Sequence, residues 1–269
     1  LNSYLSPRIY AAGAMIDGVP ATYGDAFTVK DGVEARKAVD KLAVTGVDFV
    51  KVYTGLDEPL LRAVLDEAKT FGLRVTAHLG PVDALTAGEM GVSAIEHMSG
   101  VPEAAKADPK LDAAFKAGFF PGWTAFERAW AGLDSASLAR VAERLVAEKV
   151  TLIPTLVLHD TFSRLDDPTL AADSALRAVP DSEIVRWNVP GMVGRAGWTQ
   201  EDFTAFRASR ANQDLFVRLY RAAGGRVVAG TDAANQMLIP GTSLHRELEL
   251  YVEAGFTPAD GKKIYLVDG

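Results

Sequence analysis

Four apolar runs of this sequence each end at or near a side chain that can bind a metal ion or carry a proton. The runs are GVDFVKVY, RVTAH, SAIEH and RVVAGTD, and their chemical residues are Lys51, His78, His97 and Asp232. Imidazole and carboxylate groups are ligands that zinc prefers in proteins. In parallel α/β folds the carboxyl ends of the strands line the ligand site, so we expect these four side chains to meet there.

The alternation of side chains along a strand supports this placement. Lys51 lies two positions from Phe49 and from Tyr53, and His78 lies two positions from Thr76. Residues two apart in a strand share one face. Each set can therefore point into the interior of a barrel while the other face packs against helices.

Each of the four residues also has an ordinary structural explanation. The Lys51 ammonium can extend from a strand end to water. A single histidine in an apolar strand is more often a hydrogen-bonded core residue than a ligand, and Asp232 can cap the segment that follows it. The joint pattern favours a site, because two of the chain's four histidines occupy equivalent ends of consecutive predicted strands.

The elements that must position these residues alternate along the chain. Apolar residues at helical spacing predict helices at 33–44, 57–72, 82–90, 137–148, 212–223 and 244–254. Six strands are predicted, at 8–16, 46–53, 74–78, 93–97, 151–159 and 226–232. This alternation of helix, glycine and strand is typical of βαβ units and a parallel sheet.

Two insertions interrupt the alternation, at about 98–136 and 160–206. They hold all four tryptophans of the chain, Trp123, Trp130, Trp187 and Trp198. These residues can form the core of a small helical lobe. They can also belong to a lid, because insertions after the strands of an α/β barrel lie at the mouth of the active site.

Composition narrows the class of partner. The net charge of −7 and the absence of a basic run argue against a nucleic-acid partner. No apolar stretch approaches the roughly 20 residues that a membrane span needs. Without cysteine the chain has no thiolate nucleophile, no cysteine-ligated zinc and no disulfide. A small-molecule substrate is the expected partner, and a cytoplasmic and a periplasmic or secreted location both stay open.

Several motifs, taken in order, resemble the amidohydrolase superfamily. They are GVDFVKVY, VTAHLG, AIEHMSG, the PTL of the next strand, AGTDA and GTSLHRELELYVEAGFTP, and they extend over about residues 8–258. The likeness is closest to its imidazolonepropionase-like and Xaa-Pro-dipeptidase-like branch. The resemblance implies an α/β fold, a (β/α)8 TIM-type barrel that here would occupy residues 1–258.

The resemblance also implies one or two divalent metal ions, usually zinc. In that family the lysine of the fourth strand, here Lys51, is often carboxylated by CO2 and bridges two metals. The histidines of the fifth and sixth strands, here His78 and His97, bind one metal. The aspartate of the eighth strand, here Asp232, binds the other metal and acts as general base toward the bridging water.

The sequence departs from the family pattern at both ends. It contains no His-x-His pair, which in the family stands at the end of the first strand. The barrel would then lack its first two strands in this chain, and residues 259–269 resemble a remnant of the family's small flanking β-domain. We expect a portion of a longer protein. The alternatives are strands from another polypeptide, or a reduced barrel without its first metal site.

The function that the resemblance implies is hydrolysis of an amide (C–N) bond in a dipeptide or cyclic amide by a metal-activated hydroxide. The same metals can hydrolyse an ester, a lactone or a phosphotriester, and the absent His-x-His pair also fits a catalytically inactive barrel that binds a small molecule. Tyr53, on the face of Lys51, and His159, at the end of a predicted strand, are candidate substrate contacts. Barrels of this family often pair, so a homo-oligomer stays open.

Overall fold

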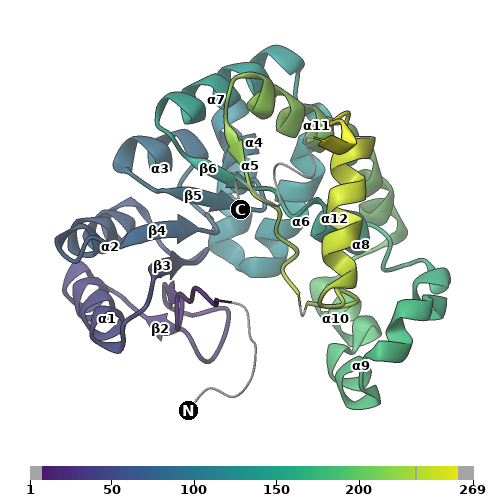
Figure 1. Ribbon diagram of the computed structural model, residues 1–269, viewed down its shortest axis with the longest axis horizontal. Coiled ribbons are helices and arrows are strands. Elements are labelled where there is room, and N and C mark those ends of the chain that lie inside the picture. The colour runs from purple at the N-terminus through teal and green to yellow at the C-terminus, as the bar shows by residue number, and fades with distance from the viewer. Residues whose placement is uncertain (1–7, 234, 260–269) are drawn as a thin grey trace.

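The computed structural model describes residues 8–233 and 235–259, and its centre is a parallel β-sheet (Figure 1). In the described part of the chain the sheet has seven strands, in the order β2-β1-β3-β4-β5-β6-β7. The strands are β1 (Ile16–Asp17), β2 (Phe27–Thr28), β3 (Phe49–Val52), β4 (Arg74–Ala77), β5 (Ala94–Glu96), β6 (Thr151–Ile153) and β7 (Arg226–Val227). Every neighbouring pair is parallel, which confirms the predicted parallel α/β class.

The sheet of the described residues has two edges, β2 and β7, and no pairing joins them. The closed (β/α)8 barrel therefore stays a prediction. The strand expected at 8–16 is wrong, because only its last residue, Ile16, enters β1, and β2 was missed. Both strands are two residues long, which is too short to give a hydrophobic pattern.

The helices expected beside the strands are present and form an arc in Figure 1. They are α1 (Gly32–Thr45), α2 (Glu58–Thr70), α3 (Ala84–Met90), α7 (Ser135–Ala147), α11 (Gln200–Ala222) and α12 (Thr242–Glu253). Their starts follow from local chemistry: the Asp57 side chain accepts the Leu60 N–H at 3.0 Å and so caps α2. The helix predicted at 212–223 is only the second half of α11.

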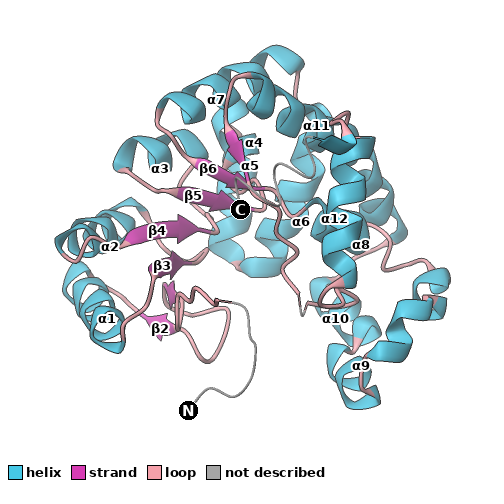
Figure 2. Cartoon of the chain, in the orientation of Figure 1, coloured by secondary structure: helices cyan, strands magenta, loops and turns pink. Residues whose placement is uncertain are grey.

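The two insertions form a helical lobe. The first holds α4 (Val101–Ala105), α5 (Pro109–Ala117), α6 (Phe119–Ala129) and the short helix η1 (Trp130–Gly132); the second holds η2 (Pro168–Ala172), η3 (Ser174–Ala178), α9 (Asp181–Trp187) and α10 (Val189–Ala196). All four tryptophans are buried, as a lobe core requires. In Figure 2 the arrowheads of β4 and β5 point toward the side where α6 and α12 lie. The lobe therefore stands beyond the carboxyl ends of the strands.

The strand predicted at 151–159 is wrong in its second half. β6 ends at Ile153, and helix α8 (Leu156–Phe162) follows. Pro154 has no N–H for the sheet ladder, and Thr155 takes a left-handed conformation with φ 48°. The apolar run after this break, LVLH, is short enough to fit a strand or a helix, and His159 lies in α8 rather than at a strand end.

None of the helices in the described ranges is both long and apolar enough to cross a bilayer. The predicted β-domain remnant at 259–269 lies, apart from its first residue, outside the described part of the chain.

Candidate active site

Parallel register brings the predicted residues to one end of the sheet. Lys51 in β3 stands opposite Thr76 in β4, and His78 and His97 directly follow β4 and β5. Within β3 the side chains alternate as predicted: Val50 and Val52 are buried, whereas Lys51 is half-buried and faces a cavity.

Lys51 forms an ion pair with Glu96, the last residue of β5. The same carboxylate accepts a hydrogen bond from Thr76 Oγ1 at 2.7 Å. Both partners of the ion pair are largely buried, at 15% and 19% side-chain exposure. Sequence reasoning missed Glu96, although a carboxylate two residues after Ala94 in an otherwise apolar strand was a usable signal.

His97 presents one ring nitrogen to two carboxylates. Its Nε2 lies 3.8 Å from Glu96 Oε2 and 3.8 Å from Asp232 Oδ2. Its Nδ1 lies 2.7 Å from Thr155 Oγ1, whose own proton goes to the Pro154 carbonyl. Thr155 must then accept from Nδ1–H, which leaves the lone pair of neutral His97 on Nε2.

His78 packs against His97, with ring centroids 4.5 Å apart. Burial lowers the pKa of both imidazoles well below the ordinary value, and the positive charge of Lys51 adds to the shift. The Nδ1 atom of His78 is buried and has no hydrogen-bond partner among the described residues. Both rings are therefore neutral and able to act as ligands.

Burial also moves the pKa values of Lys51 and Asp232 toward neutrality. It lowers the pKa of Lys51 to about 7, against the opposing effect of the Asp232 carboxylate. It raises the pKa of Asp232, against Lys51 and against Asn235 Nδ2, which donates to Asp232 Oδ2 at 2.6 Å. A group that titrates near neutral pH, as Lys51 does, is suited to proton exchange.

A cavity of about 430 Å³ lies above these residues. Its lining combines polar, aromatic and small or aliphatic side chains, namely Ala12, Met15, Tyr23, Phe49, Lys51, Tyr53, Glu96, His97, Asp232, Ala233 and Asn235. The structure thus brings Lys51, His97, Asp232 and Tyr53 together around one space. Tyr53 is buried, and its ring centroid lies 4.8 Å from that of His78.

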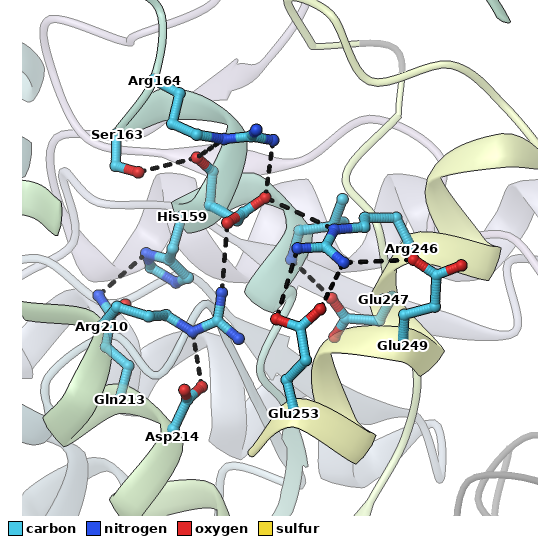
Figure 3. Close-up of polar contacts among 12 residues, drawn as sticks. His159, Ser163, Arg164, Arg210, Gln213, Asp214, Arg246, Glu247, Glu249 and Glu253 are labelled. Carbon is cyan, nitrogen blue, oxygen red and sulfur yellow. Dashed lines mark hydrogen bonds and ion pairs between the residues drawn. The ribbon is translucent and has the colours of Figure 1, made fainter. Parts of the chain in front are cut away.

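His159 does not line this cavity, and it is not a surface residue either. It is 2% exposed, its Nδ1 pairs with the Glu127 carboxylate, and Gln213 Nε2 donates to the other Glu127 oxygen at 3.0 Å. Figure 3 shows His159 close to Gln213. Contact with substrate through His159 stays a prediction.

The next residue, Asp160, lies outside the cavity lining and holds α8 in place through ion pairs. Its carboxylate binds Arg164 at 2.9 Å, Arg210 at 3.5 Å and Arg246 at 3.7 Å, the network drawn in Figure 3. Arg210 belongs to α11 and Arg246 to α12. The ion pairs therefore join three helices around the segment that carries His159. His245, beside Arg246, is exposed on α12.

The strand predicted at 226–232 is wrong beyond Val227, where β7 ends, so Asp232 lies in the segment that follows the strand. The donor chemistry suits zinc, since two neutral imidazoles and the carboxylates of Glu96 and Asp232 lie on this side of the sheet. Among the described residues, however, no three His, Asp or Glu side chains are grouped closely enough to hold one ion. The described residues therefore form no complete metal site by themselves, and metal binding by Lys51, His78, His97 and Asp232 stays a prediction.

No protein-family model matches the sequence, and no curated protein matches it. Solved structures do match. The chain is similar to bottromycin amidohydrolase (TM-score 0.67, 21% identity, covering 96% of this chain and 56% of that one). It is also similar to an Xaa-Pro dipeptidase with bound methionine, with a TM-score of 0.57 and 16% identity over 98% of this chain and 56% of that one. A third similar structure is a putative prolidase from Bifidobacterium longum, with a TM-score of 0.57 and 21% identity over 96% of this chain and 53% of that one.

This chain spans about half the length of these structures. At such identities the likeness concerns the fold, and it extends over nearly all of this chain. Over nearly all of its length the chain shares the fold of these solved structures.

Proposed function

We propose that this chain carries residues of a metal-dependent hydrolase that cleaves the amide bond of a dipeptide or cyclic amide. One observation carries the proposal: His97 Nε2, with its lone pair, lies 3.8 Å from the carboxylate of Glu96, the last residue of β5, and 3.8 Å from that of Asp232, in the segment after β7. The similar solved structures, an amidohydrolase, a dipeptidase and a putative prolidase, support it.

His78, His97, Asp232 and a carboxylated Lys51 are the residues that we propose to hold zinc. When bound, zinc would lower the pKa of a water molecule and polarise the scissile carbonyl. Lys51 suits carboxylation because burial lowers its pKa to about 7, so part of the amine is neutral at neutral pH. The neutral nitrogen can attack the carbon of CO2 and lose a proton to give the carbamate.

Asp232 is the proposed proton carrier. It stands at the cavity, and burial raises its pKa from the usual range of an aspartate. In this role it takes a proton from the attacking water and passes it to the leaving amine.

The test combines metal content with activity. The purified chain is analysed by elemental mass spectrometry and intact mass, and then assayed with dipeptides, including Xaa-Pro, and cyclic amides. We expect bound zinc and amide hydrolysis, and loss of turnover in Lys51→Ala and in Asp232→Ala with unchanged circular dichroism. Near-normal turnover in either variant contradicts the assignment. Esters, lactones and phosphotriesters in the same assay show whether another substrate class is preferred.

The incomplete donor set favours a second candidate, a protein that binds a small molecule without hydrolysing it. It predicts no bound metal and no turnover with any class of substrate, together with saturable binding of a small amide.

A further inference from the structure

Tyr23 lines the same cavity but has no part in the function proposed above. It lies in the loop between β1 and β2, and its neighbours around the cavity include Lys51 and Asp232. The side chain is 39% exposed. It therefore belongs to the cavity lining and is also reachable from solvent.

The Tyr23 ring packs against the Tyr53 ring. The two rings meet edge to face, with centroids 5.5 Å apart and planes at 68°. Burial raises the pKa of the Tyr23 phenol, which therefore keeps its proton and can donate it in a hydrogen bond.

Asp17, at the end of β1, holds the Tyr23 loop against the Tyr53 loop. Its fully buried carboxylate accepts the N–H groups of Gly18 at 2.9 Å, Thr22 at 2.8 Å and Gly55 at 2.8 Å. The two loops touch so closely that a Cβ on Gly18 would lie 2.0 Å from the Gly55 carbonyl oxygen. The position of Tyr23 relative to Tyr53 is therefore built into the backbone.

The proposed function supplies the acceptor. A dipeptide or cyclic amide that is cleaved beside Lys51 and Asp232 lies in the cavity that Tyr23 also lines, so its scissile carbonyl oxygen shares this space with the Tyr23 hydroxyl. When an amide is hydrolysed, this oxygen gains negative charge, and a fixed donor then stabilises the transition state more than the substrate.

We propose that Tyr23 contacts substrate and donates its phenolic hydrogen to the carbonyl oxygen of the scissile amide, with Asp17 as the residue that positions it. This inference rests on the proposed function.

Kinetics test the contact. Tyr23→Phe keeps the ring and removes the donor, so kcat for an amide substrate should fall on the order of 100-fold with little change in KM. Tyr10→Phe is the matched control, because Tyr10 is exposed and lies outside this cavity. It should leave both constants unchanged. An unaltered kcat in Tyr23→Phe, or a rise in KM alone, overturns the proposal.

The role of Asp17 is tested by combining variants. Asp17→Asn should lower kcat, and the double variant Asp17→Asn/Tyr23→Phe should lose no more than Tyr23→Phe does. Losses that multiply would show a general structural effect and overturn the positioning role.

A binding measurement separates this inference from the proposed function. The probe is N-acetylglycinamide, a neutral diamide, titrated calorimetrically into the wild-type chain and into Tyr23→Phe. We expect Kd to rise about 5- to 10-fold in the variant. Equal Kd values, or no binding by the wild type, overturn the contact. Binding that depends on Tyr23 in a chain that hydrolyses no amide upholds the contact with amide carbonyls and refutes the proposed function.

Discussion

Trp123 lies parallel to His159, with ring centroids 5.5 Å apart and planes that differ by 8°. Phe119 stacks on Trp123 at 6.2 Å and on Tyr53 at 6.1 Å. His78 meets the rings of Tyr53 and Trp123 edge-on. The two candidate substrate contacts, Tyr53 and His159, are thus linked by two rings of the first insertion. The lobe packs directly against the strand-end histidines.

The Glu127–His159 pair gives a first prediction. Glu127→Ala leaves His159 Nδ1 and Gln213 Nε2 buried without their partner. We expect the free energy of unfolding to fall by about 3 kcal/mol, measured by urea denaturation. Glu201→Ala is the control, because Glu201 is 82% exposed in its ion pair, and it should change stability by no more than about 0.5 kcal/mol. A similar small change for Glu127→Ala would refute the pair's role in stability.

The positions of the main candidates were predictable because strand ends leave a clear signal. His78 and His97 each terminate an apolar run and Lys51 lies near the end of one, and the parallel sheet places such ends together. The same reasoning also applies to Glu96, because this residue ends β5 and its side chain lies on the face that lines the cavity.

The positions of Asp17, Tyr23 and His159 could not be predicted, because they depend on contacts and backbone turns that the local sequence does not specify. Asp17 acts on three backbone N–H groups, one of them 38 residues away, and the segment with Tyr23 has no periodicity. The sequence predicts a strand where the helix that carries His159 lies, because a short apolar run fits both elements and the left-handed backbone at Thr155 separates them.

The Lys51–Glu96 ion pair gives a second prediction. In a double-mutant cycle with Lys51→Ala and Glu96→Ala, measured with a chelator present, we expect a coupling energy of about 1–3 kcal/mol that favours the pair. The exposed pair of Arg62 and Glu58 is the control and should couple by no more than about 0.5 kcal/mol. A coupling near zero or of opposite sign would mean that Lys51 carries no positive charge in the chelated protein.

Removal of metal gives a third prediction. Zinc at a hundred times its Kd should stabilise the chelated wild-type chain by about 2.7 kcal/mol, seen as a rise in Tm that a chelator reverses. His97→Ala should lose this response. His245→Ala should keep it, because His245 is exposed on α12, outside the cavity. The proposed metal site is refuted if zinc leaves the wild-type Tm unchanged, or if both variants respond equally.

The last prediction concerns Glu247, whose carboxylate is fully buried in α12 and accepts the Val157 N–H at 2.7 Å. Burial raises its pKa from 4.5 to about 7, against the opposing hydrogen bond from Val157. Between these two values the folded chain binds the proton more strongly than the unfolded chain does. The contribution of Glu247 to stability is therefore present below pH 4.5 and is lost as the pH rises to about 7.

Glu247→Gln keeps an acceptor for Val157 and removes the titration. Relative to the variant, the wild type should lose up to about 3 kcal/mol between pH 4.5 and 7, a difference that then stays constant at higher pH. The measurement is urea denaturation of both proteins at half-unit pH steps. Glu249→Gln, at an exposed position of the same helix, should run parallel to the wild type. If the Glu247→Gln curve also runs parallel to that of the wild type, burial does not hold this carboxyl in its neutral form.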